Sequence, residues 1–192
     1  MPKRDPKPET QLASAAVRVF MAGDRINQQL ISVLDPAAWR AQPATGVRPI
    51  VAIFTHMHNV RCKWIRLSAP HLGVPSRLSR SSCTPGQAAA GLAASSVRCS
   101  EMIGQAFDND GLVPIFRRDA IGSSWPAGVE MLCYMTSHEA HHRGQVCLLA
   151  HQLGFPLSGS VSAGFWNWEK VWKDSGWQLA IAPQTGLTPA AR

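Results

Sequence analysis

Three histidines lie within five positions in the stretch SHEAHHRGQ, residues 137–145. His138 and His142 are four positions apart, so on a helix their side chains point the same way, about one turn from each other. This is a spacing at which two imidazoles can bind one metal ion. The alternative is that hydrogen bonds within the protein satisfy both rings. The spacing by itself leaves both interpretations open.

The residues around this pair predict that it faces a protein core. At about 100° per residue, the two histidines share one stripe of a helix with apolar side chains: Met131, Met135, Val146, Leu149 and Leu153. Two imidazoles buried side by side cost free energy unless a partner satisfies them, and a shared metal ion is such a partner. Placement in the core therefore favours a metal site.

A metal site of the zinc type needs at least a third protein ligand, and the stretch FTHMHNV, residues 54–60, offers two candidates. His56 and His58 each lie about 100° from the centre of the apolar face of their predicted helix, on opposite sides. Periodicity alone does not choose between them.

The other polar residues near the pair have more ordinary interpretations. His141 lies about 60° from the axis of the stripe, so we expect it at the boundary with solvent or at the mouth of a cavity. Gln145 is expected on the core side one turn below His142, where it can hydrogen-bond within the protein or to a metal ligand. Glu139 and Arg143 are four apart on the polar side and are expected to form a surface pair.

Four stretches with helical spacing must position these residues, whereas strand-like alternation is nearly absent. The predicted helices span residues 9–34, 49–67, 85–107 and 126–153. The third helix begins with Thr84 as N-cap and Gln87 in the capping-box position, and the fourth ends at Gly154. On the first helix, Asn27 is a polar exception within the apolar stripe. The sequence predicts an all-α protein.

The connections between these helices indicate how the chain is organised. Residues 68–83 and 108–125 are longer than antiparallel neighbours in a bundle need, so at least one is expected to cross over the bundle. The late stretch FWNWEKVWKDSGW predicts a short helix packed on the bundle or on a second subunit. Its tryptophans are too costly to leave all exposed: Trp166, Trp168, Trp172 and Trp177.

Composition limits the class of protein. Of 192 residues, 45% are hydrophobic and 16% charged, which is typical of one globular domain, and no apolar run is long enough for a membrane span. The polar N-terminus is no signal peptide, so we expect a cytoplasmic protein. The net charge of +7 is scattered and no nucleic-acid motif accompanies it. Neither nucleic acid nor a membrane is therefore expected as a partner.

The cysteines and the chain ends complete this outline. The five cysteines form no CxxC pair, which predicts reduced, mostly buried thiols. We expect residues 1–9 to form a disordered tail, residues 10–183 one four-helix-bundle domain and residues 184–192 a flexible tail.

Three stretches resemble the DinB-like family, and the resemblance covers about residues 12–178: HMHNVRCKW, YMTSHEAHHRGQVCLLAHQLG and WNWEKVWKDSG. It implies a four-helix bundle in up-down-down-up order that holds a divalent metal through three histidines. One ligand comes from the second helix and two come from an HxxxH motif. The implied ligands are His56, His138 and His142, because Asn59 and Trp64 follow His56 at the spacing of the family.

The resemblance also suggests roles for the neighbours of these ligands. His58 lacks the Asn and aromatic residue that follow the family's first ligand, so it is expected, with His141, to line the cavity. Gln145 is expected to line the cavity too or to contact a ligand. The family commonly forms homodimers, so the resemblance implies one here.

Three neutral imidazoles suit Zn²⁺ or Ni²⁺ and leave the ion its full charge and an open position. Relatives in the family and its close kin include thiol S-transferases that act with bacillithiol or mycothiol, and a maleylpyruvate isomerase that uses a thiol cofactor. The resemblance therefore implies a metal-dependent thiol S-transferase of detoxification or stress response. It would use a low-molecular-weight thiol and a small-molecule substrate. The alternatives are a metal-dependent hydrolase and a metal-binding protein without catalytic turnover, and the sequence identifies no catalytic residue.

Overall fold

The computed structural model describes residues 8–108 and 111–174. Four long helices dominate it: α1 (Pro8–Val33), α2 (Ile50–Ser68), α3 (Pro85–Phe107) and α4 (Val129–Gln152). The shorter elements are a 3-10 turn, η1 (Pro70–Leu72), two strands, β1 (Ile115–Arg117) and β2 (Ser124–Pro126), and two helices, α5 (Gly159–Gly164) and α6 (Trp168–Asp174). The predicted helical bundle is confirmed. The tails expected at residues 1–9 and 184–192 lie almost wholly outside the described residues.

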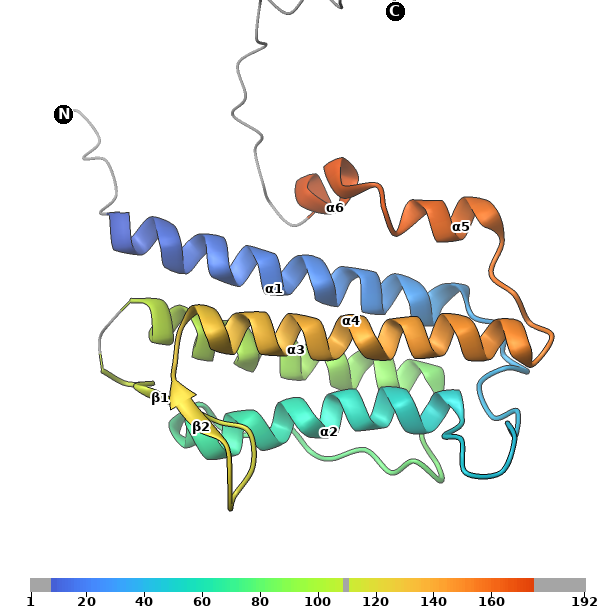
Figure 1. The fold of residues 1–192 in the computed structure, drawn as a ribbon, viewed down its shortest axis with the longest axis horizontal. Helices are drawn as coiled ribbons and strands as arrows, with labels where there is room; N and C mark the ends of the chain where they lie inside the picture. The colour runs from blue at the N-terminus through green and yellow to red at the C-terminus, as the bar shows by residue number, and fades with distance from the viewer. Residues whose placement is uncertain (1–7, 109–110, 175–192) are drawn as a thin grey trace, which may run out of the picture.

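The long helices do not simply alternate in direction along the bundle (Figure 1). α1 and α4 run one way, and α2 and α3 run the other way. The main helix contacts join α1 to α3 and α4, and α2 to the same two helices, so α1 and α2 lie diagonally across the bundle. The 69–84 connection runs back along the bundle, so that α3 starts at the same end as α2. The up-down-down-up order and the crossover after the second helix are therefore present as expected.

Two helix ends follow the local signals in the sequence. Gln87 N donates to Thr84 Oγ1 at 3.2 Å and Thr84 N donates to Gln87 Oε1 at 2.9 Å, which is the predicted capping box. After α4, Gly154 takes a φ of 85°, which favours glycine, and Phe155 N donates back to Ala150 O at 2.9 Å. Both predicted helix ends are confirmed.

Most of the core lies in two large apolar clusters with a polar layer between them, and a third, smaller cluster joins α1 to α6. Leu30 and Phe54 belong to one cluster, and Phe20 and Trp64 belong to the other. Four buried polar residues on α1, α2 and α4, joined by hydrogen bonds, form what we call the polar layer: Asp24, Asn27, Arg61 and Glu139. Two candidate ligands, His138 and His142, flank Glu139 along α4, and the third, His56, precedes Arg61 on α2.

A short hairpin, which the sequence pattern did not predict, closes one end of the bundle. β1 and β2 pair antiparallel with Phe116 opposite Trp125. Phe116 is fully buried, and its ring centroid lies 5.9 Å from that of Trp64. Arg117 N donates to Ser68 Oγ at 2.9 Å, which ties the hairpin to the end of α2. Strands of three residues are too short for alternation to reveal them.

The C-terminal helices α5 and α6 follow α4 and lie along α1 (Figure 1). Val171 of α6 is buried against Ala22 and Ile26 of α1, so the predicted packing of a short helix on the bundle is confirmed. Trp166 contributes little to this packing, because it is 76% exposed. Trp177 lies outside the described residues.

Two further expectations concern the membrane and the thiols. None of the described helices is both long and apolar enough to cross a membrane. All five cysteines are free thiols, as predicted, and three of them are buried: Cys62, Cys83 and Cys99.

Candidate metal centre

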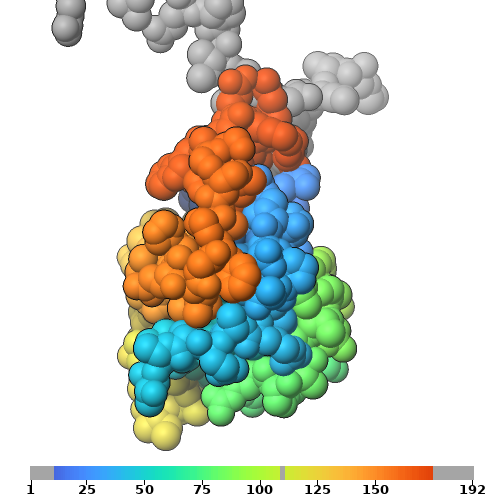
Figure 2. Space-filling model, turned by 90° about the vertical axis from the view of Figure 1, so that its right-hand side faces the viewer, coloured from blue at the N-terminus to red at the C-terminus, as the bar shows by residue number. Residues whose placement is uncertain are grey.

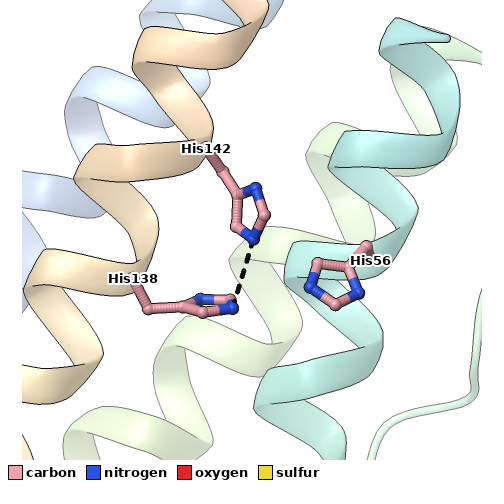
Figure 3. Close-up of side chains that lie close together, drawn as sticks. All are labelled: His56, His138 and His142. Carbon is pink, nitrogen blue, oxygen red and sulfur yellow. Dashed lines mark hydrogen bonds between the residues drawn. The ribbon is translucent and has the colours of Figure 1, made fainter. Parts of the chain in front are cut away.

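His56, His138 and His142 come together between α2 and α4 (Figure 3). One nitrogen from each ring lies within 4.8 Å of the nitrogens of the other two. α4 supplies His138 and His142 from successive turns of one face, and α2 supplies His56 from the opposite side of the site. The ring centroids lie 4.5 Å apart for His138 and His142 and 4.8 Å apart for His56 and His142. The cluster consists of the three residues that the family resemblance implies as ligands.

The imidazole of His142 is held in a tautomer that can bind a metal. Its Nδ1 donates to Gln145 Oε1 at 2.7 Å, which leaves Nε2 without a proton. That Nε2 lies 3.2 Å from His138 Nε2. Two nitrogens that share a tetrahedral zinc ion lie about 3.3 Å apart, because each zinc–nitrogen bond is about 2.0–2.1 Å long. The pair therefore has the separation that a bound ion requires.

His138 donates a hydrogen bond from Nε2 to His142 Nε2 and is otherwise oriented by packing. Its Nδ1 is buried and has no hydrogen-bond partner among the residues that the structure describes. The ring packs edge-on against Trp64, with centroids 5.3 Å apart, and lies 6.1 Å from the ring of Tyr134. These aromatic side chains belong to the cluster that the hairpin completes, so the hairpin supports one ligand of the candidate site.

Burial favours the neutral form of all three imidazoles. Burial, followed by the nearby His142, lowers the pKa of His56 from 6.5 to about 4. Burial and the neighbouring His142 and His56 lower the pKa of His138 to about 4 in the same way. The pKa of His142 is lowered as well, chiefly by burial. Neutral imidazole is the form that binds a metal, so protons should compete little with a metal ion for these rings at neutral pH.

His58 does not line this site, contrary to expectation. It is fully buried on the other side of α2, because two residues along a helix turn the side chain by about 200°. There Nε2 donates to Ser76 O at 2.9 Å, and Nδ1 lies 3.2 Å from Ser95 Oγ. Since Nε2 carries the proton, it cannot accept one from Cys62 Sγ, which lies 3.4 Å away. The His58–Cys62 contact is therefore structural and forms no nucleophilic pair.

The predicted surface pair of Glu139 and Arg143 is wrong. Glu139 is 2% exposed and binds the fully buried Arg61 through both carboxylate oxygens, at 2.6 Å to Nε and 2.8 Å to Nη2. Arg143 Nη1 donates instead to Asn27 Oδ1 at 3.0 Å. The partner of Glu139 lies on α2, and a pattern that considers α4 alone gives no sign of it.

The polar layer connects all four long helices. Arg61 Nη1 donates to Asp24 Oδ1 at 2.7 Å and to Leu92 O at 3.0 Å, and Asn27 Nδ2 donates to Glu139 Oε2 at 2.8 Å. Burial alone would raise the pKa of Glu139, but the Arg61 guanidinium outweighs burial and lowers it. For Asp24 burial outweighs its contacts with Arg61, and the pKa is raised. Glu139 is thus an ionised partner of Arg61 and is not free to act as a general base.

A cleft of about 480 Å³ lies beside His142. It is lined by the 46–48 turn and the C-terminal half of α4, which lie side by side at the end of the bundle (Figure 2, cyan and orange). His141 lines the cleft and is exposed, as expected for a residue at a cavity mouth. Gln145 also lines it and is exposed, so the expected core position is wrong, although the expected bond to a ligand is present. A second cleft of about 870 Å³, between α1 and α6, contains none of the three histidines.

The histidine cluster and nearly all of the four long helices fall within a stretch that matches a known family. The sequence model of the DinB family matches residues 10–160. The chain belongs to the DinB family. No curated protein matches the chain, and no solved structure matches it. The matched residues of this DinB family member include the three clustered histidines and end before α6.

In this DinB family member the three histidines could bind a divalent metal. Among the described residues, the cluster contains imidazoles only, so an ion bound there keeps its full positive charge. Tetrahedral coordination by three protein ligands leaves a fourth position for solvent or substrate. The arrangement therefore suits Lewis-acid chemistry at a site that adjoins an open cleft.

Proposed function

We propose that this protein is a metal-dependent thiol S-transferase that acts on small molecules in detoxification or stress response. The observation that carries the proposal is the 3.2 Å separation of His138 Nε2 and His142 Nε2, beside His56 and next to a cleft. A zinc or nickel ion held by these three residues would lower the pKa of a thiol at its open position and so supply a thiolate nucleophile at neutral pH.

The proposed reaction is a substitution at carbon. The thiol loses its proton, the sulfur forms a bond to the electrophilic carbon, and the leaving group departs with the electron pair of the bond that breaks. Gln145 and Trp64 hold His142 and His138 in their orientations. His141, whose ring centroid lies 5.2 Å from that of His142, is placed on the cleft side to accept the thiol proton.

Thiol transfer is favoured over hydrolysis because it requires less help from a base. A thiol has a pKa of about 8.5, whereas bulk water has a pKa of about 15.7, so activation of water depends more strongly on a nearby base. Glu139 is paired with Arg61, and His58 lies on the far side of α2. Of the bases that the sequence suggests, His141 is the one that remains beside the site.

Metal binding is tested first, by single substitutions. We expect His56→Ala, His138→Ala and His142→Ala each to abolish stoichiometric zinc binding in a competition titration with a chromogenic chelator, because two imidazoles alone hold zinc weakly. His58→Ala is the matched control and should retain one equivalent. Zinc retained by both His138→Ala and His142→Ala would contradict the assignment. Loss of zinc in His58→Ala but not in His56→Ala would assign the third ligand to His58.

Activity is tested with the metal-loaded protein and 1-chloro-2,4-dinitrobenzene, which releases chloride when a thiol displaces it. Bacillithiol, mycothiol, glutathione and a reaction without thiol are compared. Turnover with a thiol that disappears after chelation and in His142→Ala supports the proposal. Zinc binding without turnover for any thiol would favour the non-catalytic alternative, and hydrolysis of an activated ester without thiol would favour the hydrolase.

A further inference from the structure

The cleft beside His142 carries positive charge that no acidic residue balances. None of the described residues that line it is an aspartate or a glutamate. Arg48 lines the cleft, is exposed, and forms an ion pair with no described residue. An arginine in this setting is available to bind an anion, because its planar guanidinium offers parallel N–H donors.

The backbone before α2 restrains the position of Arg48. Val47 N donates to Ala44 O at 3.0 Å across a tight turn, and within this turn Gly46 takes a φ of 86°, which favours glycine. Pro49 follows with a φ of −67° and leads directly into the first residue of α2. Arg48 therefore sits on a short segment that is held at both ends, on the wall of the cleft that faces α4.

Arg48 is also within electrostatic reach of the candidate metal centre. Burial is the main cause of the lowered pKa of His56 and of His142, and the Arg48 charge adds to the lowering in both. Gln145 uses its Oε1 for His142, which leaves its amide N–H groups free to donate to a bound anion. A ligand held by Arg48 in this cleft would therefore lie next to His142.

The remaining walls of the cleft are largely apolar. Val47, in the turn before α2, is 51% exposed, and Leu148, on α4, is 59% exposed. Ile53 and Leu149 are buried beneath them and form part of the same lining. Exposed aliphatic side chains around one cation suit a ligand that combines an acidic group with an apolar body.

We propose that Arg48 binds a carboxylate of the substrate and holds the apolar body of that substrate between Val47 and Leu148, beside the metal centre. The inference rests on the proposed function and assigns its substrate class, small organic acids with an aliphatic or aromatic body. A carboxylate fits better than a phosphate dianion, because Arg48 is the only arginine or lysine among the described residues that line the cleft and its single charge and paired N–H donors match one carboxylate. The nearby N–H of Val51, at the start of α2, already donates to Trp39 O at 3.2 Å and is not free for a further oxygen.

Calorimetric titrations of the full-length protein test this inference with three defined probes. Hexanoate supplies the charge and the apolar body, hexanamide lacks the charge, and acetate lacks the apolar body. We expect hexanoate to bind more tightly than either of the others. We expect Arg48→Gln to weaken hexanoate binding by roughly ten- to a hundredfold, which is the usual range for a charged hydrogen bond, while hexanamide binding stays the same.

The matched control is Arg66→Gln, which makes the same charge change at the opposite end of α2 and should leave hexanoate binding unchanged. Arg48→Lys should recover part of the affinity, because it restores the charge but not the fork of donors. The inference is overturned if Arg48→Gln binds hexanoate as tightly as the unmodified protein. It is equally overturned if hexanamide binds as tightly as hexanoate.

Each titration is repeated with metal-free and zinc-loaded protein, which separates this inference from the proposed function. If the protein neither binds zinc nor transfers thiols, but Arg48→Gln still weakens hexanoate binding, the anion site is supported and the proposed function is rejected. If the protein binds zinc and transfers thiols, but Arg48→Gln does not change hexanoate binding, the anion site is rejected and the proposed function is supported.

Discussion

His138 and His142 belong to one helix face but are held in place by different kinds of contact. A hydrogen bond to Gln145 Oε1 fixes the His142 ring, whereas aromatic side chains pack against the His138 ring. A hydrogen-bonded partner of a ligand sets both its tautomer and its direction, so its removal weakens metal binding without removing a ligand. The two histidines should therefore respond differently to changes around them.

Gln145→Leu tests the hydrogen-bonded side of the site. We expect the dissociation constant for zinc to rise by about 10–100-fold with the stoichiometry unchanged, because His142 loses the partner that keeps Nε2 free. Competition with chelators of graded affinity measures the change. Gln152→Leu is the control, since Gln152 lines the same cleft but forms no hydrogen bond with a histidine. Equal zinc affinity in both variants would mean that Gln145 does not position the ligand.

The pH dependence of zinc binding follows from the lowered pKa values. In the folded protein His56 and His138 bind protons only near pH 4, so protons should compete with zinc little between pH 7 and about 5 and strongly as the pH falls through about 4. Histidines with the ordinary pKa of about 6.5 would lose affinity from that pH downward. Zinc titrations at a series of pH values measure the curve, and a midpoint near 6.5 would contradict the buried, neutral site.

The stability of the metal-free protein should change in a matching pH window. Because the pKa values of His56 and His138 are lower in the folded chain than in the unfolded chain, the unfolded chain binds more protons between about pH 6.5 and 4. Stability therefore falls as the pH falls through that window. Denaturant unfolding at several pH values measures it, with the double variant His56→Ala/His138→Ala as the control whose dependence should be shallower.

At the level of single residues, the sequence predicted the features that depend on spacing along one helix. The HxxxH spacing and the family pattern around His56 indicated the three histidines that the structure brings together. The role of Glu139 could not be predicted in this way, because its partner Arg61 lies on another helix. Residue type alone does not show which face of α4 is buried, because a carboxylate can lie in the core when it is paired with a cation.

At the level of the helices, the polar layer fixes how α2 lies against α4. Arg61 of α2 and Glu139 of α4 share a bidentate ion pair, and Glu139 directly follows the ligand His138 in the chain. A buried pair of this geometry allows few alternative registers between two helices. The distance across which His56 meets the α4 histidines is therefore set by residues that bind no metal.

Glu139→Ala should destabilise the protein by about 3–5 kcal/mol, because it leaves the Arg61 guanidinium buried without its main partner. Urea unfolding of the metal-free protein measures the change. The control is Glu101→Ala, which breaks the exposed pair with Arg98 and should cost less than about 1 kcal/mol. The double variant Arg61→Met/Glu139→Leu should recover much of the stability, and a loss as large as that of Glu139→Ala alone would contradict this explanation.

For helices and strands too, the sequence predicted the features that depend on neighbouring residues and missed those that depend on contacts between distant segments. The four long helices, the capping box and the crossover after α2 follow from periodicity, caps and connection length, all of which are local. The hairpin does not, because β1 and β2 gain their stability from the burial of Phe116 against Trp64 and Tyr134 on other elements. An interaction of this kind is invisible until the helices are assembled.

For the whole molecule, the two apolar clusters provide a core that does not depend on the histidines. Leu30 and Phe54 in one cluster and Phe20 and Trp64 in the other are fully buried among apolar side chains from several elements. A protein of this design remains folded when a bound metal is removed, in contrast to domains whose only core is the metal site.

Removal of zinc should therefore lower the melting temperature without unfolding the protein. At free zinc about a hundred times the dissociation constant, the stabilisation is about 2.7 kcal/mol, which corresponds to a shift of about 5–10 °C for a chain of this size. Circular dichroism with and without a chelator measures both the helix content and the melting temperature. Loss of the helical spectrum at 25 °C on chelation would instead indicate a structural metal.

The homodimer that the sequence led us to expect stays a prediction. Trp166 is a large apolar side chain that stays 76% exposed within the single chain. Sedimentation equilibrium of the full-length protein measures the oligomeric state directly, and a monomer at all concentrations would contradict the expectation.

The candidate ligands come from α2 and α4, and the chain between these helices comprises α3 and the hairpin. An ion bound by His56 and by His138 would act as a removable cross-link that closes this whole segment into a loop. Separation of α2 from α4 would then require loss of the ion first. Hydrogen exchange of the amides around both ends of the cross-link should slow when zinc is added, while exchange in α6, outside the loop, should not change.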